Sequence, residues 1–591
     1  MKRFFGNVVA VIIGNILTFS LFGLALFVIV MFSMAGEMFN KKSTKDNSIL
    51  ELTFNAPIKE SSMDEEFNLF APSTEESVYF NTIIRAIQAA KEDDKIKGIS
   101  LKVQSFNGGT SQLTDIRNAL VDFKSEGKFI YAYSHNADQS AYILNSTADS
   151  IFQNPLGMVF FQGLSSEVLF YKNFGDKYGI DFQVIRHGAY KAAVEPYLRD
   201  DLSDENREQL DLLLGDIWAV YAKEVAQSRN MSVETLNQNV DSLFAFNPNT
   251  SLNAKLVDKI AHEKEYENAL IQRLALDIKE KDIPYEVLAK HTVNLTDYAA
   301  SLKNDNTKNQ VAVLYASGVI MPGESYSGIQ SEVYKKEIRK LANNDHVKAV
   351  VLRVNSPGGS ADAAEEILQE LKELHKKKPI IVSFGDVAAS GGYYIAMAAD
   401  SIFASPNTIT GSIGVFGMVP NFKKLVNNLG FTTDVVNTNE NADFLRTVFN
   451  PMSENGMGTM TQMTENVYSV FVQHVMAGRQ MTYEEVDAVG GGRVWSGTAA
   501  LERGLIDRFG TLEEAIQAAA QKANIEKYSV QSYPFRKGGI EEYLKGFQNV
   551  QSEAFIQQEL GNDYFQMYKE LKSMKEGQGI QVRMPFDIKI K

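Results

Sequence analysis

The chain has 591 residues, 44% of them hydrophobic and 22% charged, and a formal net charge of −14 at pH 7. This globular composition excludes fibrous and wholly disordered proteins, and the acidic balance argues against a nucleic-acid partner because phosphate contact needs a basic face. Without any cysteine, the sequence excludes disulfides, thiolate metal sites and cysteine nucleophiles. The seven histidines show no metal-binding spacing, so we expect neither a metal nor a cofactor.

The N-terminal region contains an uncharged apolar run over residues 8–32, preceded by Lys2 and Arg3. At about 1.5 Å per residue it is long enough to cross the hydrocarbon core of a bilayer. A cleaved signal peptide is the alternative, but its apolar region is usually only about 7–15 residues long. We therefore expect an uncleaved single-pass anchor and a short stalk over residues 1–45. Positive charge before the span favours a cytoplasmic N-terminus, with the rest of the chain outside the cytoplasmic membrane.

An internal repeat covers much of the remaining chain. Residues 94–191 align with residues 345–442 without a gap, at a constant offset of 251 positions. A period of this length indicates a duplicated domain rather than a solenoid. We expect four segments after the anchor: a first copy over 46–285, a polar linker over 286–309, a second copy over 310–535, and a helical tail of unassigned role over 536–591.

Each copy alternates strand-like and helix-like segments. In the second copy, short β-branched runs over 311–315, 349–354 and 380–384 are typical of buried strands. Residues 361–377 carry apolar residues at helical spacing, with acidic side chains early and lysines late, as the helix dipole favours. Strands and helices in this order predict parallel crossovers and therefore an α/β fold.

Two glycine-rich segments follow strands of the second copy. The first, Asn355-Ser-Pro-Gly358-Gly359-Ser360, allows close approach of another backbone, and by itself is no more than a tight turn. The second, Gly385-Asp-Val-Ala-Ala-Ser390-Gly391-Gly392, ends at an expected helix, where a serine is an ordinary N-cap. It does not match the G-x-S-x-G elbow, which disfavours an α/β-hydrolase.

Taken together, these segments resemble the Clp-protease/crotonase superfamily, and in particular the signal peptide peptidases of the protease IV type in their long, double-domain form (peptidase family S49). The likeness also rests on Ile409-Thr-Gly-Ser-Ile-Gly414 and Tyr190-Lys-Ala-Ala-Val-Glu-Pro196, and it extends over about residues 45–520. It implies an α/β fold with two tandem Clp-protease/crotonase-like copies after one N-terminal transmembrane helix.

The resemblance also implies roles for individual residues. Ser390 would be the nucleophile, Lys191 the general base, and Ser412 a hydrogen-bond partner that orients the lysine. Backbone amides would form the oxyanion hole, contributed by Gly358, Gly359 and Gly391.

The repeat bears on this assignment independently. At the offset of 251, Ser390 corresponds to Gln139 in the first copy, and Lys191 corresponds to Ala442 in the second. Neither copy holds both groups, so only the two copies together can assemble one site. Because lysine is normally protonated at neutral pH, we expect burial to lower the pKa of Lys191. His187 is an alternative base, and we interpret it as a solvated residue.

The function implied by the resemblance is that of a membrane-anchored serine endopeptidase with a Ser-Lys dyad. It would degrade cleaved signal peptides and other hydrophobic peptides as a homotetramer in a bacterial inner membrane, with its catalytic domains on the periplasmic side. Two alternatives stay open. A crotonase-like acyl-CoA enzyme would need a pair of carboxylates and would leave Lys191 without a role, and a catalytically inert membrane scaffold would need no site.

Overall fold

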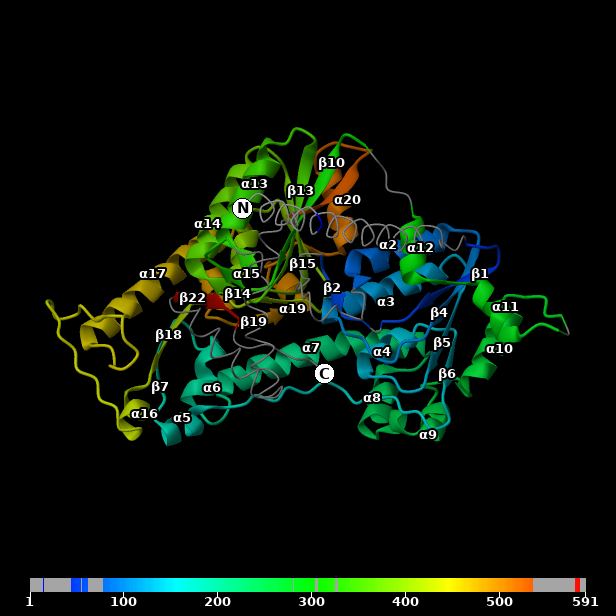
Figure 1. The fold of residues 1–591 in the computed structure, drawn as a ribbon, viewed down its shortest axis with the longest axis horizontal. Coiled ribbons are helices and arrows are strands. Elements are labelled where there is room, and N and C mark those ends of the chain that lie inside the picture. The colour runs from blue at the N-terminus through cyan, green and yellow to red at the C-terminus, as the bar shows by residue number, and fades with distance from the viewer. Residues whose placement is uncertain are drawn as a thin grey trace, which may run out of the picture.

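The computed structural model describes residues 14, 44–54, 56–61, 78–279, 281–302, 307–324, 328–534 and 580–584. Over these residues the chain forms two α/β units and a third sheet to which both units contribute (Figure 1). Apart from Gly14, the expected anchor over residues 8–32 lies outside the described residues. No helix in the described part of the chain combines the length and the apolar character needed to span a membrane.

The first copy is built on a six-stranded sheet in the order β8-β6-β5-β4-β1-β9. All neighbouring strands of this sheet are parallel. Its strands are β1 (Ser48–Leu52), β4 (Ile96–Leu101), β5 (Phe129–Ser134), β6 (Ser150–Gln153), β8 (Lys259–Ile260) and β9 (Thr292–Asn294).

The second copy is built on an eight-stranded sheet with the main order β19-β17-β15-β13-β10-β21, in which β16 pairs with β15 and β20 with β16. Its strands are parallel except β19, which runs antiparallel to β17. They are β10 (Gln310–Ser317), β13 (Val347–Ser356), β15 (Ile380–Ala389), β16 (Ser401–Ala404), β17 (Ile409–Gly411), β19 (Val494–Ser496), β20 (Arg508–Phe509) and β21 (Ser529–Tyr533).

The two sheets repeat with the spacing of the sequence. Ile96 and Val347 begin β4 and β13, and Ser150 and Ser401 begin β6 and β16, each pair 251 positions apart. The same offset relates helix α3 (Thr110–Lys124) to helix α14 (Ala361–His375). The predicted α/β fold with two tandem copies is therefore confirmed.

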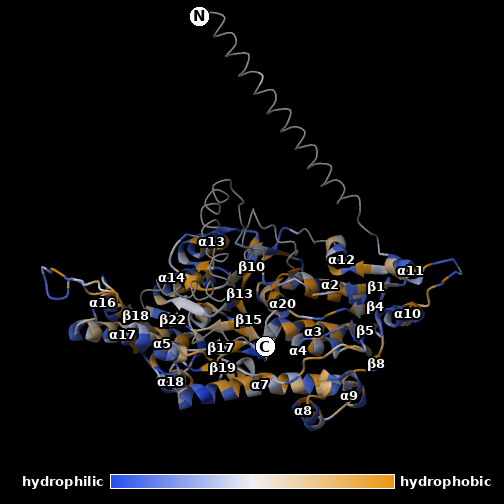
Figure 2. Ribbon diagram, turned by 60° about the horizontal axis from the view of Figure 1, so that its bottom comes forward, coloured by the Kyte–Doolittle hydropathy of each residue, from blue (hydrophilic) through white to orange (hydrophobic). Residues whose placement is uncertain are grey.

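Helices cover both faces of each sheet. In β13, Val350 and Leu352 pack into a buried cluster with α14, whereas Val351 belongs to a cluster with α20 on the opposite face. This alternation follows from the two-residue period of a strand, and it explains why the run over 349–354 is apolar at every position except Arg353. Figure 2 shows hydrophobic residues concentrated along the strands, with the hydrophilic side of α7 turned away from them.

The helices of the first copy, besides α3, are α2 (Phe80–Glu92), α4 (Gln139–Asn145), α5 (Lys172–Tyr178), α6 (Glu195–Leu198), α7 (Asp204–Ser228), α8 (Val233–Asp241), α9 (Pro248–Asn253), α10 (Glu263–Arg273), α11 (Pro284–Lys290) and α12 (Leu295–Ser301). Those of the second copy, besides α14, are α13 (Ser331–Asn343), α15 (Gly391–Ile395), α16 (Lys423–Asn428), α17 (Glu454–Arg479), α18 (Tyr483–Val489), α19 (Gly497–Glu502) and α20 (Leu512–Lys522).

Strands from both copies share the third sheet, whose order is β12-β11-β14-β22-β18-β7. Strand β7 comes from the first copy and pairs antiparallel with β18 over six residue pairs. The bounds in this sheet are β7 (Asp181–Arg186), β11 (Ile320–Met321), β12 (Ile329–Gln330), β14 (Gly358–Ser360), β18 (Phe416–Asn421) and β22 (Ile580–Arg583). A separate parallel pair consists of β2 (Ile58–Lys59) and β3 (Val78–Tyr79).

Two segments differ from the expectation. Residues 292–294, expected in a linker, form β9 at the edge of the first sheet, where Val293 is buried. Residues 580–583, expected in a helical tail, form β22. Both strands are too short to produce a recognisable period of their own, so pairing with distant strands decides their conformation. The amphipathic stretch over 540–575 lies outside the described residues.

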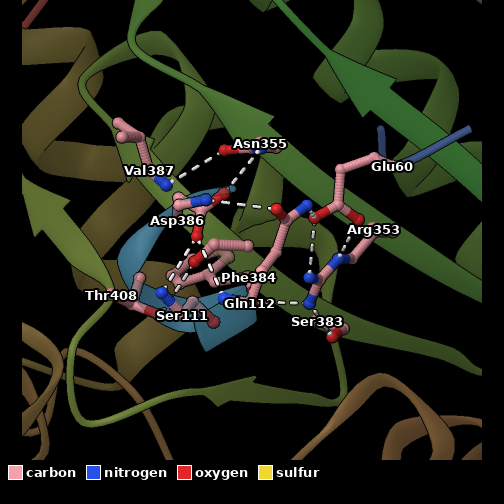
Figure 3. Close-up of polar contacts among 12 residues, drawn as sticks. Glu60, Ser111, Gln112, Arg353, Asn355, Ser383, Phe384, Asp386, Val387 and Thr408 are labelled. Atoms are coloured by element: carbon pink, nitrogen blue, oxygen red, sulfur yellow. Dashed lines mark hydrogen bonds and ion pairs between the residues drawn. The ribbon is translucent and has the colours of Figure 1, made fainter. Parts of the chain in front are cut away.

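A buried polar network joins the two copies beside β15 (Figure 3). The Asp386 carboxylate accepts hydrogen bonds from the backbone N–H groups of Ser111 and Gln112, at 2.9 and 3.2 Å, in the first turn of α3. A Cβ on Gly109 would lie 2.0 Å from the Asp386 carboxyl carbon, so only glycine fits there. Gly109, just before α3, therefore leaves room for a carboxylate from the second copy.

Asp115, in the same helix, gives a pH-dependent prediction. Burial, only partly offset by Arg353, raises the pKa of Asp115 from 3.8 to about 8. The native state then binds a proton between about pH 4 and 8 that the unfolded chain has released, so the free energy of unfolding falls as pH rises through this window. Asp115→Asn should remove that loss and be more stable than the wild type at pH 8 in urea unfolding. The control is Asp122→Asn, an exposed change on the same helix, which should leave the pH profile unaltered.

Candidate active site

Ser390 lies where β15 meets α15, at the carboxyl end of a central parallel strand. Its backbone has φ +55° and ψ −115°, an unusual conformation for a residue with a side chain. The N–H of Ser390 donates to Gly411 O at 2.8 Å, and its carbonyl accepts from Tyr394 N at 2.8 Å. Ser390 occupies the N-cap position, but its hydroxyl makes no capping hydrogen bond. Such strain persists where surrounding structure imposes it, often at functional sites.

Lys191 reaches this point from the first copy. It follows β7, which β18 holds against the second copy, and it precedes a short 3-10 helix over Ala192–Val194. Its backbone packs directly on Gly492, where an added Cβ would lie 2.6 Å from the Cβ of Lys191. Gly492 also has φ +87°, so both its conformation and its contact require glycine. Sequence reasoning missed this residue, although the run Gly490-Gly491-Gly492 was a visible signal.

The structure brings Lys191, Ser390 and Ser412 together. The Lys191 Nζ lies 2.8 Å from Ser390 Oγ, 2.9 Å from Ser412 Oγ and 3.1 Å from Ser412 O. Ser412 Oγ in turn lies 3.2 Å from Gly492 O, to which it donates. All three residues have no exposed surface. Two residues 199 positions apart in sequence, one from each copy, therefore share one buried hydrogen bond.

The electrostatic environment of Lys191 is nonpolar or neutral. Burial lowers the pKa of its amine well below the ordinary value of 10.5. The atoms that hydrogen-bond to Nζ belong to serines, so no carboxylate among them stabilises the ammonium form. The nearby Glu195 side chain is engaged elsewhere, since it accepts from Ser203 and Asn206. Burial without a counter-ion favours a neutral amine.

The glycines expected in the oxyanion hole lie at the same edge of the sheet. Gly358 and Gly359 follow β13, and Gly391 follows Ser390 after the adjacent β15. A Cβ on Gly359 would lie 2.0 Å from Ile320 O, so close strand contact requires glycine. The N–H of Gly358 already donates to Ser356 Oγ at 3.1 Å. Backbone amides therefore lie at the sheet edge near Ser390, although the amide of Gly358 already donates to a side chain of this chain.

The positions that correspond by repeat have other roles. The Gln139 side chain, at the position matching Ser390, accepts hydrogen bonds from the N–H groups of Gln162 and Gly163. Ala442, at the position matching Lys191, lies exposed in a loop. Each copy therefore supplies one residue of the Lys191–Ser390 pair. At the other position, the first copy has Gln139 in a structural role, and the second copy has the exposed Ala442.

His187 differs from its expected solvated state. Its ring stacks on Tyr468 with centroids 3.6 Å apart, and its Nδ1 lies 2.8 Å from Glu465 Oε2. The side chain is 27% exposed, so His187 is only partly solvated. These contacts join the first copy to α17, and none of the hydrogen bonds of His187 reaches Ser390. Within the described residues, no group of three or more acidic or histidine side chains is placed to hold a metal ion.

Comparison with known proteins agrees with this architecture. A model of peptidase family S49 matches residues 122–277 and 372–526, once in each copy, and a Clp protease model matches residues 303–410. The chain is 37% identical to Protease 4 of Haemophilus influenzae over 453 residues, which cover 75% of this chain and 72% of the relative. It is 34% identical to Protease 4 of Salmonella typhi, covering 76% and 73%. It is 32% identical to the chloroplastic serine protease SPPA of Arabidopsis thaliana, covering 74% and 64%. The chain therefore belongs to peptidase family S49 and is a serine protease.

Proposed function

We propose that Ser390 and Lys191 form a catalytic Ser-Lys dyad that hydrolyses peptide bonds. The observation that carries the proposal is the 2.8 Å separation of Lys191 Nζ and Ser390 Oγ in a fully buried setting. A neutral amine has two N–H groups and one lone pair. The two contacts with Ser412 accommodate the N–H groups, which leaves the lone pair directed to the Ser390 hydroxyl.

In this mechanism the Ser390 proton passes to Lys191 Nζ as Oγ attacks the carbonyl carbon of the substrate. Backbone N–H groups at the sheet edge, those of Gly391 and of the turn around Gly359, stabilise the oxyanion. The lysine then transfers its proton to the leaving amine, and the C–N bond breaks. A water molecule attacks the acyl-enzyme with the same base and releases the second product.

The competing acyl-CoA reading is disfavoured by the chemistry at the site. It requires carboxylates as acid and base, but the described partners of the Ser390 and Lys191 side chains are serines and backbone atoms. It also leaves unexplained why a lysine is buried without a counter-ion, which costs free energy. A catalytically inert scaffold would equally leave the free-energy cost of burying Lys191 without a counter-ion unexplained.

A serine-reactive probe tests the proposal. A fluorophosphonate should label the wild-type chain on Ser390, and labelling and peptide hydrolysis should both disappear in Ser390→Ala. The matched control is Ser356→Ala, since Ser356 is equally buried at the same sheet edge but contacts Gly358 N rather than Lys191. Undiminished labelling or hydrolysis in Ser390→Ala would refute Ser390 as the nucleophile.

For the cellular setting we propose a single-pass anchor in a bacterial inner membrane, periplasmic catalytic copies, a homotetramer, and hydrophobic peptides such as cleaved signal peptides as substrates. The apolar run over 8–32 and the two preceding positive charges support the topology. Large exposed apolar side chains after α16, namely Leu429, Phe431 and Val436, support contact with further copies.

Alkaline phosphatase fused after residue 45 should be active in cells. An inactive fusion together with an active cytoplasmic reporter at the same junction would reverse the topology.

A further inference from the structure

Helix α7 of the first copy lies against strand β19 of the second copy (Figure 1). Gln209, in the second turn of this helix, is only 1% exposed, and its side-chain amide contacts both copies. Its oxygen accepts a hydrogen bond from the N–H of Val494 in β19 at 3.3 Å, and its nitrogen donates to the carbonyl of Tyr190 at 3.2 Å. One buried side chain therefore joins the residue before Lys191 to the second copy.

The two backbone groups that contact Gln209 lie next to the residues of the candidate active site. The carbonyl of Tyr190 belongs to the peptide bond whose nitrogen is that of Lys191. On the other side, β19 directly follows Arg493, whose carbonyl accepts from the N–H of Ser412 at 2.7 Å. Gln209 therefore connects the backbone beside Lys191 with the strand beside Ser412, through contacts separate from those of the lysine amine.

Two further buried side chains fix the orientation of the Gln209 amide. Gln209 Nε2 also donates to Asn206 Oδ1 at 3.0 Å, and Asn206 Nδ2 donates to Glu195 Oε2 at 2.9 Å. A carboxylate only accepts hydrogen bonds, so Asn206 must turn its NH₂ group to Glu195 and its oxygen to Gln209. The nitrogen of Gln209 then faces Asn206 and the Tyr190 carbonyl, and its oxygen faces the second copy.

The same carboxylate supports the carbonyl on the other side of Lys191. Arg186 Nη1 lies 3.6 Å from Glu195 Oε1 and donates to Lys191 O at 3.4 Å. The carbonyl groups before and after the Lys191 side chain thus each accept from a side chain that is linked to Glu195. Other titratable side chains near this segment have partners of their own, Arg493 with Glu208 and His187 with Glu465.

We propose that Gln209 is a positioning residue for the general base, which fixes the backbone of Lys191 so that its amine meets Ser390. The inference rests on the proposed dyad and adds a residue from outside the glycine-rich segments and the lysine motif. A lysine side chain is a flexible four-carbon stem, so its amine reaches one point reproducibly only when its backbone is held. A misplacement of about 1 Å can cost about 10²-fold in rate. Gln209 acts through Lys191 and does not touch the substrate.

The test compares two substitutions of similar size in the full chain. Gln209→Met removes both contacts, whereas Gln209→Glu keeps an acceptor for Val494 N and replaces the donor to the Tyr190 carbonyl with an oxygen. Both variants should lower kcat for a peptide substrate about 10²-fold with KM little changed, because only the base is displaced. In Gln209→Glu the rise of kcat/KM with pH should also move to higher pH, since a nearby carboxylate favours the ammonium form of Lys191.

The matched control is Asp216→Ala. Asp216 lies two turns further along α7 and accepts from Ser496 Oγ in β19, so it also joins the two copies, but away from Lys191. This variant should lower the melting temperature and leave kcat and the pH profile unaltered. A wild-type kcat in either Gln209 variant, or an equal fall in kcat in Asp216→Ala, would overturn the inference while Ser390-dependent probe labelling upheld the protease. Wild-type labelling that does not depend on Ser390 would instead refute the proposed function.

Discussion

Replacing Lys191 with arginine is expected to reduce kcat by at least about 10³-fold, because a general base typically contributes about 10²–10⁴-fold and Lys191 is also part of a two-residue unit. Arginine retains a positive charge and a long side chain but does not deprotonate in proteins, so it cannot accept the Ser390 proton. Steady-state hydrolysis of a peptide substrate measures the effect. In the wild-type enzyme, kcat/KM should rise with pH as Lys191 becomes neutral, and the rise should occur well below pH 10.5 because burial lowers the pKa of this amine.

Two further variants distinguish the loss of the general base from the loss of the residue that orients it. Lys191→Ala should lose as much activity as Lys191→Arg. Ser412→Ala should lose less, because Ser412 only orients the amine through its 2.9 Å contact. Thermal melting should show all three variants folded, which excludes unfolding as the cause. A Lys191→Arg enzyme that cleaves peptides at a near wild-type rate would end the dyad hypothesis.

The fold could be predicted from sequence where the pattern is local or repeated. The β-branched runs became β10, β13 and β15, and the helical spacing over 361–377 became α14, which ends at His375. The duplication was visible because residues 94–191 align with residues 345–442 without a gap. The complementary absence of serine at 139 and lysine at 442 pointed to a site shared between copies, and the short distance between Lys191 and Ser390 agrees with it.

Other features depend on contacts between distant segments and have no local signature. The glycines before α3 look like a degenerate turn in sequence, yet Gly109 accommodates Asp386 of the other copy. Gly492 is needed because the backbone of Lys191 lies against it, a contact between residues about 300 positions apart. The four residues Ile580–Arg583 resemble any short amphipathic stretch, and only their pairing with β14 and β18 makes them a strand.

The contact expected to affect stability most is the buried ion pair between Glu60 of the first copy and Arg353 of the second (Figure 3). The Arg353 Nε and Nη2 lie 2.9 and 3.0 Å from the two carboxylate oxygens, and Nη1 donates to Phe384 O at 2.7 Å. Burial opposes the charge of Arg353, but the Glu60 carboxylate outweighs it and raises the pKa of the guanidinium. Removing one partner of such a pair typically costs about 3–5 kcal/mol, because the other charge is left buried and unpaired.

Glu60→Gln and Arg353→Met should therefore each lower the free energy of unfolding by about that amount in urea titrations, and the double variant should lose clearly less than the sum. Arg353→Met should be the more damaging of the two single variants at neutral pH, since it leaves the Glu60 and Asp386 carboxylates buried together without their cation. Because protonation would relieve that repulsion, its stability relative to the wild type should recover as pH falls, whereas Glu60→Gln should show no such recovery. Strictly additive losses with parallel pH profiles would mean that the pair does not couple the two copies. Arg353→Met should also reduce activity, because Arg353 holds the carbonyl of Phe384 in the strand that ends at Ser390.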